Sequence, residues 1–372
     1  MTVQRHLLYE RLYNYVLDDI RKGTLRSGDR VPSEKELARK HGVSRITSMR
    51  ALQNLERAGL VERIRGKGTY VARDLERLDV LHNSHDGHPP RSRRLTSRIA
   101  LLMPDASPAY GLELMNAIEE RAGERGLSLV LKRSRGLQEV EERAIDALMS
   151  SASVDGVIVF PVNGEFYNAS LLRLALAKHP LVLIDRYLKG IQATSVYTDN
   201  HAAAKELTGY VLDSGHKHVA FVSSPPANTS SIEDRLHGFR AAFSQRGIGL
   251  DRQHLLIDLT SGFPNPETKI ADDREAIRAL VSRNESITGF VASEYPIALI
   301  IHDVFSGRDQ LKGKMITCFD SPRGQFVEPR FTHVQQNERE MGRRAVDLLL
   351  AQLDGHPTPS PSIVPYQLVK LD

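Results

Sequence analysis

Basic, hydroxyl and amide side chains gather between residues 45 and 54 and have the chemistry of a surface that contacts nucleic acid. Arginine donates hydrogen bonds to phosphates and guanine edges, and threonine, glutamine and asparagine bind either target. If Leu52 faces inward on a helix, the positions about 100° or more away are Ile46, Thr47, Arg50, Gln53 and Asn54. Arg45 falls in the first turn, where free amides also favour phosphate. The pattern predicts a DNA-reading helix; the plainer alternative is a helical hairpin with a solvated polar face.

Two short helices joined by a tight turn are predicted to position these side chains. Ser33 followed by Glu36 is a capping box, which predicts that the first helix begins at Ser33. Gly42 predicts its end, because glycine leaves a helix at no steric cost, and Ser44 is suited to cap the second helix. The inward stripe of the second helix is predicted to be Ser48, Ala51, Leu52 and Leu55. The segment therefore predicts a helix-turn-helix.

A hairpin with a basic, glycine-rich tip is predicted to follow. Two short strands, Leu60–Ile64 and Thr69–Ala72, flank the tip residues 65–68. Glycine lets a backbone approach a phosphate or the minor groove closely, and Arg65 and Lys67 supply charge. Residues 1–73 are thus predicted to form a winged helix-turn-helix domain. Its candidate DNA-binding residues are Lys35, Ser44, Arg45, Ile46, Thr47, Arg50, Arg65, Gly66, Lys67 and Gly68.

With an opening helix expected from about Leu7 to Lys22, this segment resembles the winged-helix DNA-binding domain of GntR-family transcription regulators. The matching motifs are Leu8-Tyr9-Glu10, Gly28-Asp29, Val31-Pro32-Ser33-Glu34, Val43-Ser44-Arg45, Ala51-Leu52, Gly59-Leu60 and Gly66-Lys67-Gly68-Thr69. The sequence departs from the family pattern at Met49, which stands where the family usually has a second arginine. Arg50 points outward one position later and is a candidate to replace it, so the preferred DNA site need not follow the family's.

Charge is divided unevenly along the chain. Residues 1–73 hold 16 Lys and Arg against 8 Asp and Glu, a net charge of +8, whereas the rest holds 34 against 38, a net charge of −4. The basic charge therefore coincides with the predicted reading helix, which is the electrostatic footprint of nucleic-acid binding.

The single cysteine, Cys318, excludes an intrachain disulfide framework and fits a reducing cytosol. Because it lies in an apparent buried strand, we expect a structural thiol rather than a nucleophile. No signal-peptide pattern and no run of ~18 apolar residues is present. We therefore expect a cytoplasmic protein that does not span a membrane.

Residues 74–98 differ in composition from the segments on either side, with Pro89-Pro90 and a cluster of arginines. We interpret them as a linker. The spacing of His82, His85 and His88 raises the alternative of a metal site, but no helical periodicity or cysteine accompanies them, and linkers tolerate polar residues freely. No metal site is predicted.

From Ile99 onward, short apolar runs alternate with amphipathic helical stretches such as Leu112–Glu124. The runs are Ile99–Met103, Leu127–Leu131, Val154–Phe160, Leu181–Ile184, Val219–Ser223, Gly289–Ala292 and Met315–Phe319. Near-continuous apolar runs are typical of strands covered on both faces, so the predicted fold class is α/β, with a doubly wound parallel sheet. At 372 residues the chain can hold two or three domains, and so many strands favour two lobes. We place the change of lobe after Tyr197.

Polar side chains follow several of these predicted strands. Ligands of open parallel sheets bind beyond the carboxyl ends of the strands, where this chain has Asp105, Asp185, Arg186, Asp199, Glu294 and Asp320. Each carboxylate can accept from two hydroxyls and each guanidinium can donate to two oxygens, which suits a neutral polyhydroxy compound such as a sugar. Singly, each residue has a plainer role: Asp199 could cap the next helix, and Asp185 could pair with Arg186.

No motif for catalysis accompanies this fold. The first strand is followed by residues 103–108, Met-Pro-Asp-Ala-Ser-Pro, instead of the glycine-rich turn of a dinucleotide-binding fold. The sequence also lacks a phosphate-binding loop, a nucleophile elbow and a metal triad. We predict no enzymatic activity and no cofactor.

Residues 99–372 resemble the effector-binding and dimerisation domain of LacI/GalR-family repressors, itself similar to periplasmic sugar-binding proteins. The matching motifs are Val154-Asp155-Gly156-Val157-Ile158, Ile184-Asp185-Arg186, Val196-Tyr197-Thr198-Asp199-Asn200, Gly215-His216-Lys217-His218-Val219-Ala220, Arg235-Leu236-His237-Gly238-Phe239, Phe319-Asp320 and Gly342-Arg343-Arg344-Ala345. The resemblance implies that Arg235 and Asp320 bind the effector and that the chain crosses between lobes again near Ser321 and Gly355. Ser293-Glu294 replaces the usual Asn-Asp, so the ligand or its pose can differ. The candidate effector-binding residues are Asp105, Tyr110, Asp185, Arg186, Arg235, Glu294 and Asp320.

A GntR-type winged helix joined to a LacI-type sensor resembles the arabinose-responsive repressors of the GntR family, and arabinose is one candidate effector. The leading hypothesis is a homodimeric repressor that a small sugar releases from operator DNA. One alternative is an enzyme fused to a winged helix, as in aminotransferase-like regulators, which needs a Schiff-base lysine in a much larger domain. Another is an export-dependent binding protein with an N-terminal extension, which the absent signal peptide and the basic first segment disfavour.

Overall fold

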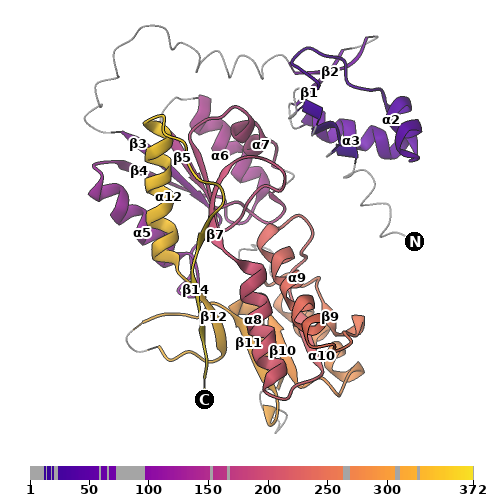
Figure 1. Cartoon of the computed structure of the whole chain (residues 1–372), viewed down its shortest axis with the longest axis vertical. Helices are drawn as coiled ribbons and strands as arrows, with labels where there is room; N and C mark the ends of the chain where they lie inside the picture. Colours follow the sequence, from indigo (N-terminus) through magenta and orange to yellow (C-terminus); the bar gives the residue numbers. More distant parts are fainter. Residues whose placement is uncertain are drawn as a thin grey trace. The chain divides into compact units, whose positions relative to one another are not determined.

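The computed structural model in Figure 1 describes residues 12–371 with some gaps. The residues outside the description are 1–11, 14, 18, 21–23, 58–59, 65–66, 73–96, 151–153, 166–167, 263–268, 306–310, 325–326 and 372. The predicted linker therefore lies outside the described residues almost entirely, together with His82, His85 and His88. The chain divides into two compact units, residues 1–94 with 167–179 and residues 95–166 with 180–372.

The first unit contains the helix-turn-helix and its hairpin. Its elements are α2 (Glu34–His41), α3 (Arg45–Arg57), β1 (Val61–Ile64), β2 (Gly68–Val71) and α7 (Ala169–Leu176), and the described positions between 12 and 20 are also helical. The capping box is confirmed: the Ser33 amide donates to Glu36 Oε2 at 2.7 Å, and the Glu36 amide donates to Ser33 Oγ at 3.3 Å. Gly42 ends α2 at a φ of 64°, a left-handed conformation that glycine adopts without strain.

The second unit consists of two lobes, each built on a six-stranded sheet (Figure 1). The first sheet is parallel throughout and has the order β13-β7-β6-β5-β3-β4. The second has the order β14-β12-β11-β10-β8-β9 and is parallel except for β14, which runs antiparallel to β12. The predicted α/β class with parallel sheets is confirmed. The strands are β3 (Arg98–Met103), β4 (Ser128–Arg133), β5 (Gly156–Val159), β6 (Leu181–Ile184), β7 (Thr194–Thr198), β8 (Val219–Val222), β9 (Leu255–Leu256), β10 (Gly289–Ala292), β11 (Met315–Phe319), β12 (Thr332–Gln336), β13 (Ser362–Val364) and β14 (Tyr366–Val369).

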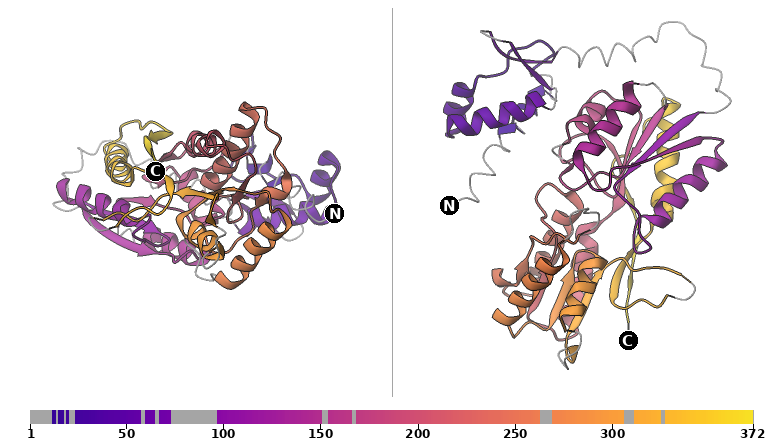
Figure 2. Two further views of the ribbon diagram at one scale, coloured as in Figure 1. Left: turned by 90° about the horizontal axis from the view of Figure 1, so that it is seen from below. Right: turned by 180° about the vertical axis from the view of Figure 1, so that it is seen from behind.

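Helices cover the sheets of this unit, as the two views of Figure 2 show. In the first lobe, α5 and α12 pack on one face and share its core through Leu114, Ile118 and Leu349. In the second lobe, α8 and α9 cover one face and α10 and α11 the other. The strands are buried by these layers, which is why they read as apolar runs. The helices are α5 (Leu112–Glu124), α6 (Gln138–Ser150), α8 (Asn200–Asp213), α9 (Ser230–Gln245), α10 (Ile270–Arg283), α11 (Tyr295–Phe305) and α12 (Glu338–Leu353).

Three connections join the lobes, and two of them differ from the predicted positions. The first follows β7, where α8 begins in the second lobe. The chain does not leave the second lobe near Ser321, because residues 332–336 return to form β12 beside β11; it leaves at Asn337. It also does not cross near Gly355, because β13 first pairs with β7 in the first lobe, and the crossing falls at Pro365. The strands β12 to β14 were not predicted, because β12 is largely polar and β13 and β14 are only three and four residues long.

Within the described part of the chain, no helix combines the length and the apolar character needed to cross a bilayer. The same residues also bring no three His, Cys, Asp or Glu side chains together as metal ligands.

Candidate functional site

A pocket lies where the carboxyl ends of strands from both sheets meet. The space among its lining atoms, counted together with the part open to solvent, is about 440 Å³, and six of the seven candidate effector-binding residues line it: Tyr110, Asp185, Arg186, Arg235, Glu294 and Asp320. The remaining lining residues include the rings of Phe160, Tyr295 and Phe319. Four of the charged residues expected at the carboxyl ends of strands, Asp185, Arg186, Glu294 and Asp320, therefore meet in one pocket although they span 135 residues of sequence.

Asp185 and Asp320 occupy equivalent places in the two lobes. Asp185 follows β6 and its amide donates to Val196 O at 2.9 Å; Asp320 follows β11 and its amide donates to Val334 O at 2.7 Å. Both have a positive φ, 71° and 61°, which is uncommon for residues other than glycine, asparagine and aspartate. Such conformations often occur at functional sites, because the surrounding structure has to hold them.

In the first lobe, Arg186 is the centre of a buried polar network. Its Nη2 donates to Asn163 Oδ1 at 2.7 Å, and its guanidinium lies 5.4 Å from the centre of the Phe160 ring. Glu165 Oε2 is 3.7 Å from Nη1, too far for a hydrogen bond. Nε and Nη1 make no hydrogen bond among the described residues, but each faces a carboxylate within ion-pair distance, Asp185 and Glu165 respectively.

Asp185 interacts with Tyr110 as well as with Arg186. The Tyr110 hydroxyl donates to Asp185 Oδ1, and Arg186 Nε lies 3.5 Å from Asp185 Oδ2. Burial raises the pKa of the Tyr110 hydroxyl well above its ordinary value, and the charge of Asp185 raises it further. Tyr110 is therefore a neutral donor at physiological pH.

In the second lobe, Arg235 lies on α9 and is buried, with 4% of its surface exposed. Its Nε donates to Asn200 Oδ1 at 2.8 Å and its Nη1 to Ser293 O at 2.7 Å. The guanidinium lies 3.9 Å from the centre of the Phe319 ring, a stacking distance for a cation–π contact. These contacts hold the guanidinium in one orientation at the pocket wall.

Asp320 and Glu338 are carboxyl groups with raised pKa values. Asp320 accepts from Gln336 Nε2 at 2.7 Å, and burial raises its pKa to about 6 although the Arg235 charge acts in the opposite direction. Glu338 accepts from the amides of Gly111 and Leu114 at the start of α5; burial raises its pKa to about 8, assisted by the charge of Asp320. Both groups favour the protonated form more than an exposed carboxyl does.

The raised pKa of Glu338 predicts a pH-dependent loss of stability. A folded-state pKa above the ordinary 4.5 means that the carboxyl's contribution is fully present below about pH 4.5 and is lost as the pH rises toward 8. Glu338→Gln keeps an oxygen that can accept from both amides but cannot ionise. Its melting temperature should exceed that of the wild type by a margin that grows between pH 5 and pH 8. Glu139→Gln, on the exposed surface of α6, is the control; a margin independent of pH would contradict the assignment.

Of the seven candidate effector-binding residues, Asp105 is the one that does not line the pocket, and the strand-end residue Asp199 caps α8 instead. The Asp105 carboxylate forms an ion pair with Arg133 on β4 and accepts from the Ala106 amide at 2.7 Å. Phe160 and Gln336 line the pocket but were not predicted. Both lie at the carboxyl ends of strands, Phe160 after β5 and Gln336 at the end of β12. A search of every strand end would have found Phe160. Gln336 was missed because β12 was not recognised as a strand.

In the first unit, α3 presents the side chains that were predicted to face outward. Ser48, Ala51, Leu52 and Leu55 are buried, as predicted. Lys35, Arg45, Arg50 and Lys67 are exposed, and Ile46 exposes 72% of its surface. A large exposed apolar side chain beside arginines suits contact with the methyl group of thymine.

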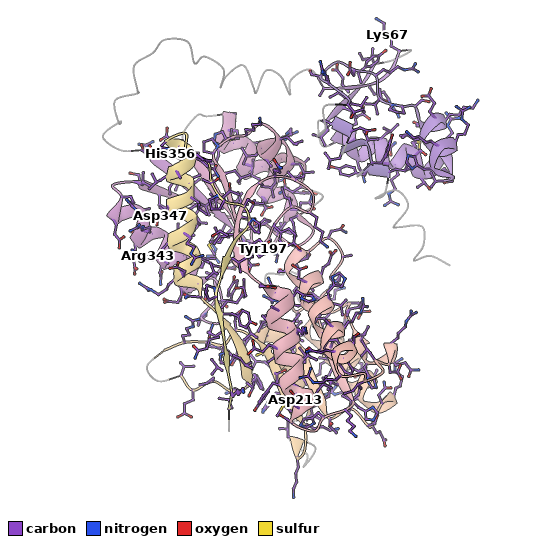
Figure 3. All side chains as sticks on the ribbon, viewed as in Figure 1. Lys67, Tyr197, Asp213, Arg343, Asp347 and His356 are labelled. Carbon is purple, nitrogen blue, oxygen red and sulfur yellow. The ribbon has the colours of Figure 1, made fainter. Side chains whose placement is uncertain are left out.

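Three of the candidate DNA-binding residues, Ser44, Arg45 and Thr47, also have structural contacts. Ser44 Oγ accepts from the Thr47 amide at 3.1 Å and so caps α3. Arg45 Nε lies 3.3 Å from Glu34 Oε2, and Arg63 on β1 binds the other oxygen of Glu34 at 2.6 Å. Figure 3 shows Lys67 at the tip of the hairpin, whereas Arg65 and Gly66 lie outside the described residues. Gly68, which follows, has a φ of 119°, a conformation that favours glycine.

Each of the two units matches a known protein family. Residues 8–71 match the bacterial regulatory proteins of the gntR family, and residues 99–357 match the periplasmic binding protein domain. The chain is 27% identical over 356 residues to the arabinose metabolism transcriptional repressor of Halalkalibacterium halodurans, covering 93% of this chain and 90% of that protein.

Two solved structures show the same fold. The transcription regulator CcpA of Lactococcus lactis superimposes with a TM-score of 0.64 at 19% identity, covering 74% of this chain and 98% of that one. A complex of the transcriptional regulator CelR with cellobiose gives a TM-score of 0.63 at 22% identity, covering 91% and 99%. The chain therefore belongs to the periplasmic-binding-protein domain family and carries a gntR-family regulatory domain at its N-terminal end.

Proposed function

We propose that this protein is a sugar-responsive transcriptional repressor. In this proposal the winged helix binds operator DNA, and a small neutral sugar in the pocket between the lobes releases it. The relatives are transcriptional regulators, and the names of two of them mention arabinose and cellobiose. We infer that the pocket binds a ligand, because the proteins that the chain resembles are regulators by name.

The observation that carries the proposal is the composition of the pocket wall. Two guanidiniums and three carboxyl groups, those of Asp185, Glu294 and Asp320, surround a space bordered by aromatic rings. Hydroxyl groups can donate to the carboxylates and accept from the arginines, while the rings pack against the C–H face of a sugar. The carboxyl groups outnumber the arginines, which disfavours a phosphorylated or acidic ligand.

The test is a thermal-shift screen of the purified protein against neutral sugars, beginning with arabinose and cellobiose, and against the corresponding sugar phosphates. Each sugar is measured with and without operator DNA. We expect one neutral sugar to raise the melting temperature and to weaken DNA binding. Stabilisation by sugar phosphates alone would contradict the proposed ligand class.

We further propose that the two-lobed domain forms a homodimer, so that two winged helices read a palindromic operator. One winged helix makes few contacts, and paired half-sites in such dimers lie about 34 Å apart or a multiple of it. Light scattering at micromolar protein concentration measures the oligomeric state directly. A monomer both with and without DNA would contradict this part of the proposal.

Operator binding should depend on Arg50 and Lys67. Arg50→Ala removes a donor from the reading face of α3 and should weaken binding about tenfold and relax base preference. Lys67→Ala removes a phosphate contact at the hairpin tip, so it should weaken binding at all sequences and reduce the slope of log affinity against log salt by about one. Arg143→Ala, on the exposed surface of α6, is the matched control. Fluorescence anisotropy at 50 to 200 mM salt measures the operator affinity of each variant. Unchanged affinities would show that the outward face of α3 and the hairpin tip are wrongly assigned to DNA binding.

A further inference from the structure

The N-terminus of α9, which belongs to the second lobe, is capped by Glu165 of the first lobe. The N-cap residue Thr229 makes no side-chain hydrogen bond to its own helix. Instead Glu165 Oε1 accepts from the Ser230 amide at 2.6 Å, and Thr229 Oγ1 accepts from the Gly164 amide at 3.1 Å. A carboxylate at this end also interacts favourably with the helix dipole. The side chains of Glu165, Thr229 and Ser230 are all buried.

A second set of contacts extends the junction along the next turn of α9. The Tyr187 amide donates to Ser230 Oγ at 3.1 Å, the Tyr187 hydroxyl donates to Asp234 Oδ2 at 3.0 Å, and Lys189 forms an ion pair with Glu233. The Tyr187 ring stacks on Tyr197, which is at the end of β7 where the chain passes between the lobes (Figure 3). We name these groups the cross-lobe latch: Gly164, Glu165, Tyr187 and Lys189 on one side, and Thr229, Ser230, Glu233 and Asp234 on the other.

The cross-lobe latch is continuous with the pocket on both sides. In the first lobe, Arg186 is the chain neighbour of Tyr187 and lies 3.7 Å from Glu165. In the second lobe, Ser231 and Arg235 of α9 line the pocket one residue beyond Ser230 and Asp234. A change in the position of α9 relative to the first lobe therefore moves Arg235 relative to Asp185 and Arg186. The bonds of the latch join protein groups only and need no effector.

We propose that the cross-lobe latch positions α9 for effector binding, so that Tyr187, Thr229 and Glu165 set the affinity without touching the ligand. This rests on the proposed sugar-binding function of the pocket. When only a fraction of molecules has the binding-competent arrangement, the apparent affinity is the intrinsic affinity multiplied by that fraction. The latch raises this fraction by favouring the arrangement in which both lobes complete the pocket wall. Its residues are thus positioning residues that also set the sugar concentration at which the protein leaves DNA.

Two conservative variants remove one cross-lobe bond each. Thr229→Val leaves the Gly164 amide without its acceptor but removes no cap from α9, and Tyr187→Phe removes only the bond to Asp234. Neither side chain lines the pocket. Each should weaken the binding of arabinose, or of whichever neutral sugar binds the wild type, by about two- to tenfold in titration calorimetry. Asp213→Asn is the matched control, since it breaks an ion pair with Arg246 that lies within the second lobe.

A measurement without ligand tests the inference separately from the proposed function. Spin labels at Glu139→Cys on α6 and Glu275→Cys on α10 report the separation of the lobes, because both side chains are well exposed and the native Cys318 is buried. Thr229→Val and Tyr187→Phe should shift the distance distribution toward longer separations, and Asp213→Asn should not. Unchanged distributions, or unchanged affinity in a protein that binds sugar, would overturn the inference. If the wild type binds no sugar, the proposed function fails while the distances still decide on the latch.

Discussion

Arg235→Ala should weaken effector binding by about one to two orders of magnitude and leave operator binding intact. Charge-assisted hydrogen bonds contribute roughly 1.5 to 3 kcal/mol each, and each 1.4 kcal/mol is tenfold in affinity. Arg235 is held at the pocket wall by Asn200, Ser293 and the Phe319 ring, so its guanidinium is already oriented before a ligand arrives. The variant should therefore remain on operator DNA at sugar concentrations that release the wild type.

Titration calorimetry with the sugar identified in the screen measures the first effect, and anisotropy with labelled operator DNA measures the second. Arg235→Lys keeps the charge but loses the planar guanidinium, and it should lie between wild type and alanine. Arg246→Ala is the control for the loss of an arginine from α9. Arg246 lies at the C-terminal end of that helix and forms an ion pair with Asp213 of α8 on the surface. Wild-type sugar affinity in Arg235→Ala would show that the effector binds elsewhere.

Among glycine-to-alanine substitutions in the second lobe, Gly238→Ala should lower the free energy of unfolding the most. Helices α8 and α9 pack backbone against backbone at this position: a Cβ at residue 238 would lie 2.2 Å from His201 O and 2.9 Å from the Ala204 Cβ. Overpacking usually costs 1–3 kcal/mol, and here the obstacle is a main-chain carbonyl that cannot rotate away, so we expect about 3 kcal/mol or more. Because α9 also carries Ser231 and Arg235, the variant should lose effector affinity as well.

Denaturant unfolding of wild type and variant measures this loss. Gly123→Ala is the matched control, because Gly123 also lies in a helix, α5, and a Cβ there would meet nothing within 4 Å. That change should stabilise the protein by about 0.5 to 1 kcal/mol through the better helix propensity of alanine. Equal effects of the two substitutions would contradict the close packing of α8 and α9.

The helix-turn-helix was predictable from sequence because its determinants are local. The Ser33 and Glu36 capping box, the left-handed Gly42 and the inward stripe that contains Ser48 each follow from rules that act within one or two helical turns. The strands of the two lobes were predictable for a related reason: a strand buried on both faces has to be apolar along its whole length.

The expectation that ligands bind beyond the carboxyl ends of the strands also located most of the pocket. The carboxyl ends of parallel strands share one edge of a sheet whatever the details of packing. The same expectation predicted both Asp185 and Asp320 without any knowledge of their left-handed backbone. It could not separate Asp105 from the others, because the Arg133 that binds Asp105 lies on the neighbouring strand β4. A pairing between strands is a tertiary contact that the sequence around Asp105 does not encode.

The sequence by itself therefore determined the helix-turn-helix, the α/β class and the side chains at the strand ends. Only the tertiary structure decided the crossings at Asn337 and Pro365, the burial of Arg235 and the capping of α9 by Glu165. The physical reason is the distance along the chain over which each determinant acts. Caps, turns and apolar periodicity act between near neighbours, whereas Glu165 and Ser230 are 65 residues apart and meet only when both lobes have folded and docked.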